Sequence, residues 1–314
     1  MTHLRPTRLG AVLSLVAGLA FAVPPVLGQL ALDGGATISA LLGWRYAIAA
    51  VVLAVIARKR LRGVPLPVAG IAFVLGAGLY TADAALFYAA LERTSAPFTT
   101  LLHYAHLVVV VGVAAMLGRE RLDARRVAAL VGVIAGVALV GGGGGADEVG
   151  IALALASAAA YSGYILVSDR LLRDTDPLAF ATYLLGGSAV AFCVFGAATG
   201  QLGSIGGSTG VAAAVVGAIV GSVLAVSAFL AGIRLAGPGT ASLLVTVEVP
   251  AGLALATLVL GEQLEAVQLA GAAIVLAAIA LLQVPIGRPR RRLADVVPLP
   301  VSANGGEPAD ALAA

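Results

Sequence analysis

Two stretches of equal length decide the fold: FTTLLHYAHLVVVVGVAAMLGRERL at residues 98–122 and TASLLVTVEVPAGLALATLVLGEQL at residues 240–264. A Leu-Leu pair lies near the start of each, and a Glu followed two residues later by Leu closes each. Leu101 matches Leu243, and every other matched pair has the same separation, which is nearly half of the 314-residue chain. Both stretches contain an apolar run of about the length that crosses a hydrocarbon core as a helix. They indicate a membrane protein with an internal repeat, whose constant separation we call the repeat offset.

The composition of the whole chain agrees with a membrane protein. Hydrophobic residues make up 60% and charged residues only 11% of the sequence, and the mean hydropathy is +1.04. Soluble domains carry about 25% charged residues, so a soluble fold of this sequence could not cover its surface with polar groups. The net charge of +3 gives no reason to expect a nucleic-acid partner. The single cysteine, Cys193, can form neither an intrachain disulfide nor a zinc site, and we expect no metal and no cofactor.

Ten apolar stretches are long enough, or nearly so, to cross a membrane as helices. We predict spans at residues 9–30, 36–57, 67–91, 96–117, 127–142, 149–167, 177–198, 211–233, 240–260 and 264–286. The fifth is short, and the glycine run 141–145 predicts a flexible exit. After residue 286, arginines lead into a tail whose composition is typical of disorder.

The first span has a competing interpretation as a cleaved signal peptide. Arg5 and Arg8 precede its apolar run, as basic residues do in such peptides. The run continues through Pro24 and Pro25, however, and is longer than an ordinary signal core. We therefore expect the segment to stay in the protein as a span.

Basic residues are confined to alternate predicted loops. If the N-terminus is cytoplasmic, all of the 19 Lys and Arg residues except Arg45 and Arg93 fall in cytoplasmic segments, as the positive-inside rule requires. The prediction is a multi-pass protein of a bacterial-type inner membrane, surrounded by the lipid bilayer, with both termini in the cytoplasm.

Each apolar half of the chain contains five predicted spans. Because five is odd, the second half must enter the membrane from the opposite side, so the halves are inverted-topology repeats. The fold class is an all-α membrane protein of ten transmembrane helices. We place the repeats at residues 9–145 and 146–286, between an N-terminal segment 1–8 and a tail 287–314. The competing explanation is chance similarity between two Ala/Leu-rich halves.

Ionisable side chains inside the predicted spans are the best indications of a site, because such groups usually face a bundle interior or a watery cavity. Arg45 lies in the second span, Asp83 in the third, His103 and His106 in the fourth, and Glu248 in the ninth. At the repeat offset, His106 corresponds to Glu248. The two should therefore occupy equivalent positions near the centre of the membrane.

Helical spacing adds neighbours to these ionisable groups. Thr99 shares a face with both histidines, Tyr80 shares a face with Asp83, and Tyr161 and Tyr164 share a face with serines of the sixth span. The candidate substrate-binding or coupling residues are then Arg45, Tyr80, Asp83, Thr99, His103, His106, Tyr161, Tyr164 and Glu248. A cavity with aromatic walls, a few hydroxyls and few charges suits a small, partly apolar or zwitterionic solute.

Each candidate also has a structural interpretation. Arg45 could pair with Asp83 or extend towards an interface, the histidines could be hydrogen-bonded packing residues, and the tyrosines are often packing residues. Glu248 is the hardest to explain as passive. A buried carboxylate needs a partner or a bound proton, and a bound proton suits proton coupling.

Further motifs follow one another in both halves. Residues 87–96 read FYAALERTSA, and residues 118–122 read GRERL; the second half has ASLL at 241–244, EVP at 248–250 and GEQL at 261–264. Together with the Arg45-Tyr46 pair, they resemble EamA-type members of the drug/metabolite transporter superfamily over residues 9–286. The resemblance implies two inverted five-helix repeats, a central cavity, and transport or export of amino acids or related metabolites. The first repeat departs from the family pattern at His106, near which a Pro is usual, so His106 is a candidate specificity or proton-linked residue.

The leading hypothesis is a secondary transporter that exports a small-molecule metabolite by alternating access. No ATP-binding motif is present in the sequence, so we expect a gradient to supply the energy. Proton coupling through Glu248 or His106 is an additional hypothesis, and a homodimer is left open. The alternatives are a membrane-embedded enzyme acting on lipid, with His103 or His106 as base, and a non-transporting scaffold. We expect no enzyme and assign no catalytic residue.

Overall fold

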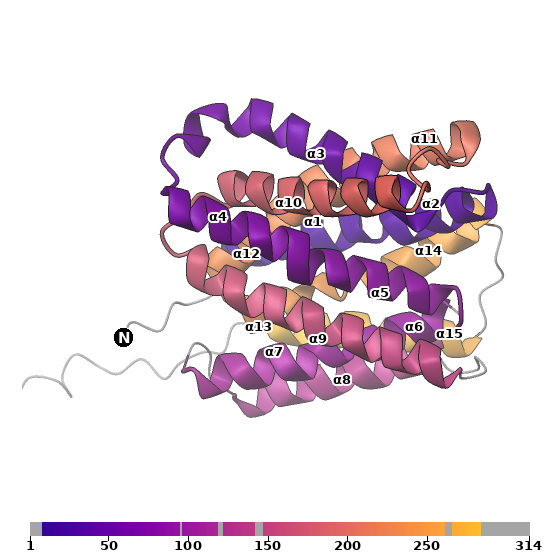
Figure 1. Ribbon diagram of the computed structural model, residues 1–314. Helices are drawn as coiled ribbons and strands as arrows, with labels where there is room; N and C mark the ends of the chain where they lie inside the picture. Colours follow the sequence, from indigo (N-terminus) through magenta and orange to yellow (C-terminus); the bar gives the residue numbers. More distant parts are fainter. Residues whose placement is uncertain (1–7, 95, 119–121, 142–146, 261–265, 284–314) are drawn as a thin grey trace, which may run out of the picture. The chain divides into compact units, whose positions relative to one another are not determined.

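The structure is a computed structural model that describes residues 8–94, 96–118, 122–141, 147–260 and 266–283. In these residues the chain forms ten helical spans, and no strand is named among them (Figure 1). We number the spans 1 to 10 in chain order: α1–α2 (Arg8–Phe21, Val23–Asp33), α3 (Ile38–Leu61), α4–η1–α5 (Leu66–Leu75, Gly76–Tyr80, Thr81–Leu91), α6–α7 (Ala96–His103, Ala105–Met116), α8 (Ala124–Gly141), α9 (Glu148–Leu171), α10 (Pro177–Ala198), α11–η2–α12 (Gly207–Val216, Gly217–Leu224, Ala225–Ala236), α13–α14 (Pro238–Val245, Glu248–Leu260) and α15 (Ala266–Gln283). The predicted all-α fold of ten spans is confirmed.

The outer surfaces of the spans are apolar. Seven of the spans contain a stretch that is both long enough and apolar enough to cross a membrane; spans 4, 5 and 10 are shorter or interrupted in the described residues. Val51, Val55, Leu258 and Met116 are between 65% and 88% exposed. Large apolar side chains exposed along many helices are stable when lipid surrounds them.

Spans 4 and 9 are interrupted at equivalent places. Span 4 breaks at Tyr104 and span 9 at Thr246, and these two positions correspond at the repeat offset. The break in span 9 follows from Pro250, whose nitrogen has no hydrogen to donate to the carbonyl oxygen of Thr246. Interrupted helices of this kind form the binding sites of many secondary transporters.

Span 4 breaks without a proline. The ring nitrogen Nδ1 of His106 lies 2.8 Å from the backbone carbonyl oxygen of His103. In a continuous helix that oxygen would accept from the N–H of Leu107, but Leu107 donates to the carbonyl of Tyr104 at 3.0 Å. Since a carbonyl can only accept, Nδ1 of His106 carries the proton. The side chain of His106 therefore supports the break where the family resemblance leads one to expect a proline.

Spans 3 and 8 form a second equivalent pair, because each contains a π-helical segment, η1 and η2. Such widened turns are rare and frequently mark functional sites. The Gly76 carbonyl oxygen in η1 accepts hydrogen bonds from the hydroxyls of Thr81 and Ser188, both at 2.8 Å. A Cβ at position 76 would lie 1.8 Å from a backbone oxygen of span 7, so glycine is required at this crossing.

The two repeats interleave. α3 packs along α10, α1 along α12, and α5 along α9 (Figure 1). The last two pairings are equivalent, because span 1 of one repeat corresponds to span 6 of the other, and span 3 to span 8. One apolar core lies between these spans, and a second cluster joins spans 4, 5, 9 and 10 through Leu107, Val133, Leu244 and Val275.

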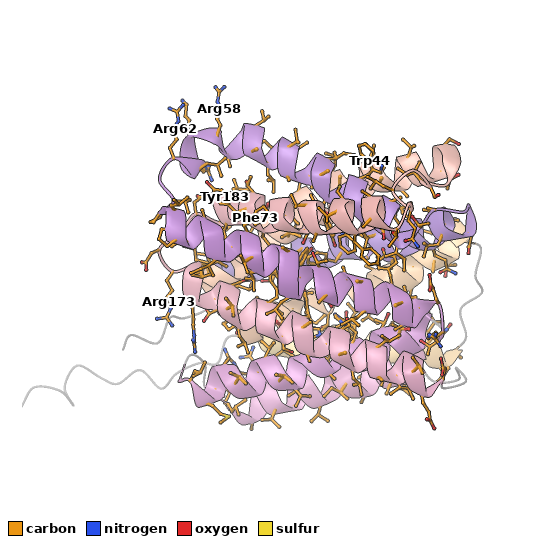
Figure 2. The ribbon with its side chains drawn as sticks, viewed as in Figure 1. Trp44, Arg58, Arg62, Phe73, Arg173 and Tyr183 are labelled. Atoms are coloured by element: carbon orange, nitrogen blue, oxygen red, sulfur yellow. The ribbon has the colours of Figure 1, made fainter. Side chains whose placement is uncertain are left out.

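Most described basic side chains gather at one end of the spans, which we call the basic end. Figure 2 shows Arg58, Arg62 and Arg173 there, whereas Trp44 lies towards the other end. Arg60 Nη1 lies 3.1 Å from Asp176 Oδ2, which ties the last turn of α3 to the N-cap of α10. The residues of the basic end are Arg8, Arg58, Lys59, Arg60, Arg62, Arg125, Arg126, Arg170, Arg173 and Arg234.

The opposite end, which we call the Arg93 end, has its own contacts. Arg93 Nη1 lies 3.2 Å from Asp147 Oδ2. This contact and the backbone N–H of Val149 hold the pKa of Asp147 below its ordinary value. The backbone N–H of Thr37 donates to the carbonyl oxygen of Ser204 at 2.8 Å, joining two further loops.

Some sequence predictions lie outside the described residues. They are the flexible exit at 142–145, most of the turn 118–122, the segment 261–264 and the tail 287–314. The predicted repeat boundary at residues 145 and 146 also falls there.

Candidate functional site

Six spans line a central cavity of about 130 Å³. Spans 1, 4 and 9 contribute residues at their interruptions, and spans 2, 3 and 6 complete the wall. The cavity lies nearer the Arg93 end, since Tyr88 and Thr100 of its lining flank the loop that contains Arg93. The lining residues are Phe21, Pro24, Pro25, Arg45, Tyr46, Tyr80, Asp83, Ala84, Phe87, Tyr88, Thr100, His103, Tyr104, His106, Tyr161, Val245 and Glu248.

Asp83, Ser157 and His103 form a hydrogen-bonded group at this cavity. The Ser157 hydroxyl donates to Asp83 Oδ1 at 2.7 Å, and His103 Nδ1 lies 2.9 Å from Ser157 Oγ. Because the serine hydrogen is directed at the carboxylate, the imidazole is the donor to the serine. His103 Nδ1 is also 3.7 Å from Asp83 Oδ1. The group connects spans 3, 4 and 6 at the cavity wall.

Aromatic rings continue this wall in a row. The ring centroids of His103 and His106 are 5.1 Å apart, those of His106 and Tyr161 4.8 Å, those of Tyr161 and Tyr164 5.5 Å, and those of Tyr164 and Tyr80 5.0 Å. The structure thus brings together the aromatic candidates from three spans. Tyr164 is not in the lining itself; it is buried between Tyr80 and Tyr161.

Arg45 lines the cavity but does not pair with Asp83. Its Nε donates to the Ser222 hydroxyl oxygen at 2.9 Å, and its Nη2 donates to the Gly221 carbonyl oxygen at 3.3 Å, both in η2. The guanidinium carbon lies 5.2 Å from the ring centroid of Tyr46, at a distance that permits a cation–π contact. The side chain is only 7% exposed, so it does not extend towards an interface either. Arg45 therefore has neither of the two structural roles that the sequence left open, pairing with Asp83 or extension towards an interface.

Glu248 approaches the same cavity from span 9. It is half-buried at the start of α14 and lies within electrostatic range of Asp83, Tyr104 and Tyr161. Its carboxylate makes no hydrogen bond or ion pair with another described residue. His106, its counterpart in the first repeat, lines the cavity from the equivalent break. The two repeats thus place an imidazole and a carboxylate at matching positions.

A single family model matches the chain twice. The model of the EamA-like transporter family matches residues 8–142 and again residues 148–284. The chain belongs to the EamA-like transporter family. Membership confirms the resemblance seen in the sequence and the presence of two repeats, and it makes the protein a multi-pass membrane transporter of a small-molecule substrate. This EamA-like protein is accordingly not an enzyme, and neither the lipid-acting enzyme nor the scaffold is supported.

A solved structure has the same fold as this EamA-like transporter. It is a crystal structure described only as that of a protein, and it is 19% identical in sequence. The match covers 87% of this chain and 96% of that chain, with a TM-score of 0.73. At this identity the likeness shows the fold alone. No curated protein matches the sequence.

Like Tyr164, Thr99 is a candidate that the structure of this EamA-like transporter does not place in the cavity lining. Its hydroxyl forms a hydrogen bond with that of Thr94, and the side chain is fully buried outside the cavity lining. Thr99 does share a helical face with His103. It lies in the first turn of α6, however, where its hydroxyl is hydrogen-bonded to Thr94 of the adjacent loop. Thr100 lines the cavity in its place.

Sequence reasoning missed several other lining residues. Tyr104 lies at the break between the two histidines, and its buried hydroxyl has no hydrogen-bond partner within the described part of the chain. Tyr88 donates to the carbonyl oxygen of Pro24 at 3.4 Å. Pro24 and Pro25 carried a usable signal, because helix-breaking residues in the middle of a span often mark a discontinuous helix.

A second, larger cavity of about 360 Å³ lies at the surface of this EamA-like transporter, between α3 and α11. Its lining is almost entirely apolar, with Trp44, Ile48, Leu202 and Val211 among its residues, and it contains no ionisable side chain. It offers nothing that would orient a polar solute. Nor do the described residues contain a group of three or more His, Cys, Asp or Glu side chains that could hold a metal ion. The central cavity is the better candidate site.

Proposed function

We propose that this transporter is a gradient-driven secondary carrier that exports a small metabolite, such as an amino acid or a related compound. The observation that carries the proposal is the arrangement of charge in the central cavity. Arg45 and Glu248 both line it, and neither has an ion-pair partner among the described residues. A zwitterionic solute carries the two complementary charges.

The size and walls of the cavity support a small solute. A volume of about 130 Å³ corresponds to roughly four water molecules in the liquid. Tyr80, Phe87 and Tyr161 offer ring surfaces to an apolar portion of the solute. These dimensions fit an amino acid or a compound of similar size better than a large drug or a lipid.

Alternating access follows from the repeats at residues 9–145 and 146–286, which we propose rock against each other. The cavity lies near the Arg93 end, while the contact between Arg60 and Asp176 joins the ends of α3 and α10 at the basic end. Opening the basic end and closing the Arg93 end would expose the solute to the other side. We propose that the basic end is cytoplasmic, by the positive-inside rule, with both termini there and the protein in the cell membrane.

A proton gradient is the proposed energy source, with Glu248 or His106 as the coupling group. A half-buried carboxylate at membrane depth without a partner can bind a proton when the solute is absent. Asp83 and His103 are less available, since both are engaged by Ser157.

Flux across proteoliposome membranes tests the carrier function. Vesicles containing the purified protein are loaded with the proteinogenic amino acids and related amines and carboxylic acids, one at a time. We expect gradient-dependent flux of at least one small zwitterion, absent from protein-free vesicles. Silence across the whole panel would contradict the carrier proposal.

Glu248→Gln tests the coupling step in the same vesicles. The amide keeps the size of the side chain but cannot exchange a proton. We expect pH-driven uptake to fall roughly tenfold or more, while exchange of solute without a pH gradient continues. Glu92→Gln, an exposed carboxylate at the Arg93 end, is the matched control and should leave uptake unchanged. An unaltered pH-driven rate in Glu248→Gln would exclude Glu248 as the coupling group.

A further inference from the structure

We infer that Arg45 is the subsite for a single carboxylate of the transported solute, an inference that rests on the carrier function proposed above. Both hydrogen-bond partners of Arg45 are neutral oxygens, the Ser222 hydroxyl and the Gly221 carbonyl. Asp83, one possible partner that the sequence left open for Arg45, instead accepts a hydrogen bond from Ser157. The guanidinium is therefore held in place without being neutralised.

A cation at this depth without a counter-charge is costly. Arg45 is buried, and no described carboxylate lies within ion-pair distance of it. Charged side chains inside spans are rare, and they usually pair with each other or mark the path of a substrate. Since the described protein supplies no pair for Arg45, the second explanation applies.

The second repeat shows that packing does not require an arginine here. At the repeat offset, Arg45 corresponds to Gly187. A Cβ at Gly187 would lie 2.0 Å from the carbonyl oxygen of Phe73, so spans 7 and 3 cross in direct backbone contact. The equivalent crossing of spans 2 and 8 is built around the Arg45 side chain, which packs against Gly217 and Gly221. One repeat closes this crossing with glycine, and the other places a charge there at the cavity wall.

The chemistry of the guanidinium favours a carboxylate as the ligand. It has five N–H groups, and the two hydrogen bonds to η2 occupy one on Nε and one on Nη2. Nη1 and the rest of Nη2 can form the paired hydrogen bonds of a bidentate carboxylate. A dianionic phosphate is less favourable, because Asp83 and Glu248 line the same cavity and would repel a second negative charge. The same acids would attract a cationic group at the other end of the solute.

Solute pairs that differ only at the carboxylate test this assignment. L-Alanine, L-threonine and L-leucine are each compared with their carboxamides, which replace the anion by a neutral group of similar size. Counterflow is measured in proteoliposomes of the full chain, and thermal stabilisation is measured in detergent. We expect the acid of at least one pair to be transported and to stabilise the wild-type protein roughly tenfold more effectively than its amide. In Arg45→Gln the ratio of the effect of the acid to that of its amide should fall to near one.

Three variants separate recognition from folding. Arg93→Gln removes an arginine from a half-exposed contact outside the cavity and should keep the wild-type ratio. Ser222→Ala loses only the hydroxyl that accepts from Nε, so the ratio should decrease in part. Arg45→Lys keeps the charge but loses the paired N–H groups of the guanidinium. It should weaken transport and thermal stabilisation by the acid and leave those by the amide unchanged. This variant remains informative if Arg45→Gln does not fold.

The outcomes distinguish this inference from the carrier proposal. A wild-type protein that transports amides as well as acids has no carboxylate subsite, although it is still a carrier. Equal losses for acid and amide in Arg45→Lys show that Arg45 has only a structural role and overturn the assignment. Transport of neither member of any pair, with no thermal stabilisation, contradicts the carboxylate subsite, whereas the carrier proposal is contradicted only if the whole panel of solutes described above also shows no flux.

Discussion

His106 serves the backbone as well as the cavity. Its Nδ1 donates to the carbonyl oxygen of His103, which the break in span 4 leaves without its usual helical donor. Its other ring nitrogen, Nε2, is buried and has no hydrogen-bond partner among the described residues. The hydrogen bond to His103 thus accounts for the histidine at the position where the sequence departs from the family pattern. The unpaired Nε2 can either be a packing atom or contact the solute.

Replacing His106 separates these two roles. In His106→Ala the buried carbonyl of His103 loses its donor, so we expect the folded state to be destabilised by about 1–3 kcal/mol, seen as a lower melting temperature in detergent. His106→Asn can donate from its amide and should recover most of the lost stability. A variant His106→Ala that melts like the wild type would show that the hydrogen bond does not support the break.

The site residues that could be predicted from the sequence are mainly those whose side chains are unusual inside a membrane span. Arg45, Asp83, His103, His106 and Glu248 were found because ionisable groups inside apolar spans are rare, and all of them line one cavity. Ser157, as the link between Asp83 and His103, was not predictable, because a serine in a span is common and its partner is determined by how spans 3, 4 and 6 meet. Other neutral lining residues, such as Tyr88 and Tyr104, were missed for the same reason.

At the scale of elements, the breaks and the π-helical segments differ in how predictable they are. Pro250 carries a local signal, since proline interrupts a helix in any surroundings. The π-helical segment η1 carries no such signal. Its Gly76 carbonyl accepts from Ser188 of span 7 as well as from the nearby Thr81, so its geometry depends in part on a contact between residues far apart in the chain. The widened turn follows from tertiary packing, which the local sequence does not encode.

The crossing of spans 3 and 7 can be tested with two adjacent glycines. Gly187→Ala would place its Cβ 2.0 Å from a backbone oxygen of Phe73, and backbone atoms cannot rotate away. We expect a loss of about 1–3 kcal/mol or more from overpacking, measured as a fall in melting temperature. Gly186→Ala is the matched control: its nearest neighbour would be a Phe73 ring atom at 4.0 Å. Equal melting temperatures for the two variants would contradict the close approach.

At the scale of the whole molecule, the repeat offset predicted which spans are equivalent but not which spans touch. Equivalence follows from aligned residues such as His106 and Glu248. Contact depends on how the inverted halves interleave. The pairing of α1 with α12, or of α5 with α9, could not be predicted from the sequence of either repeat. The cavity between spans of both repeats could therefore be expected from the architecture, while its shape could not.

The sidedness of the molecule gives the last prediction. Basic residues gather at one end of the spans, and a membrane potential and the insertion machinery retain such residues on the cytoplasmic side. In a background of Cys193→Ser, Gly63→Cys places a thiol in an exposed loop at the basic end, and Ser204→Cys places one in an exposed loop at the Arg93 end. Neither position has a positive φ, so both should tolerate the change. In intact cells, a membrane-impermeant maleimide should label Ser204→Cys and leave Gly63→Cys unlabelled until the membrane is permeabilised. The reverse pattern would place the basic end outside the cell. The proposal that the central cavity lies nearer the external side would then be wrong.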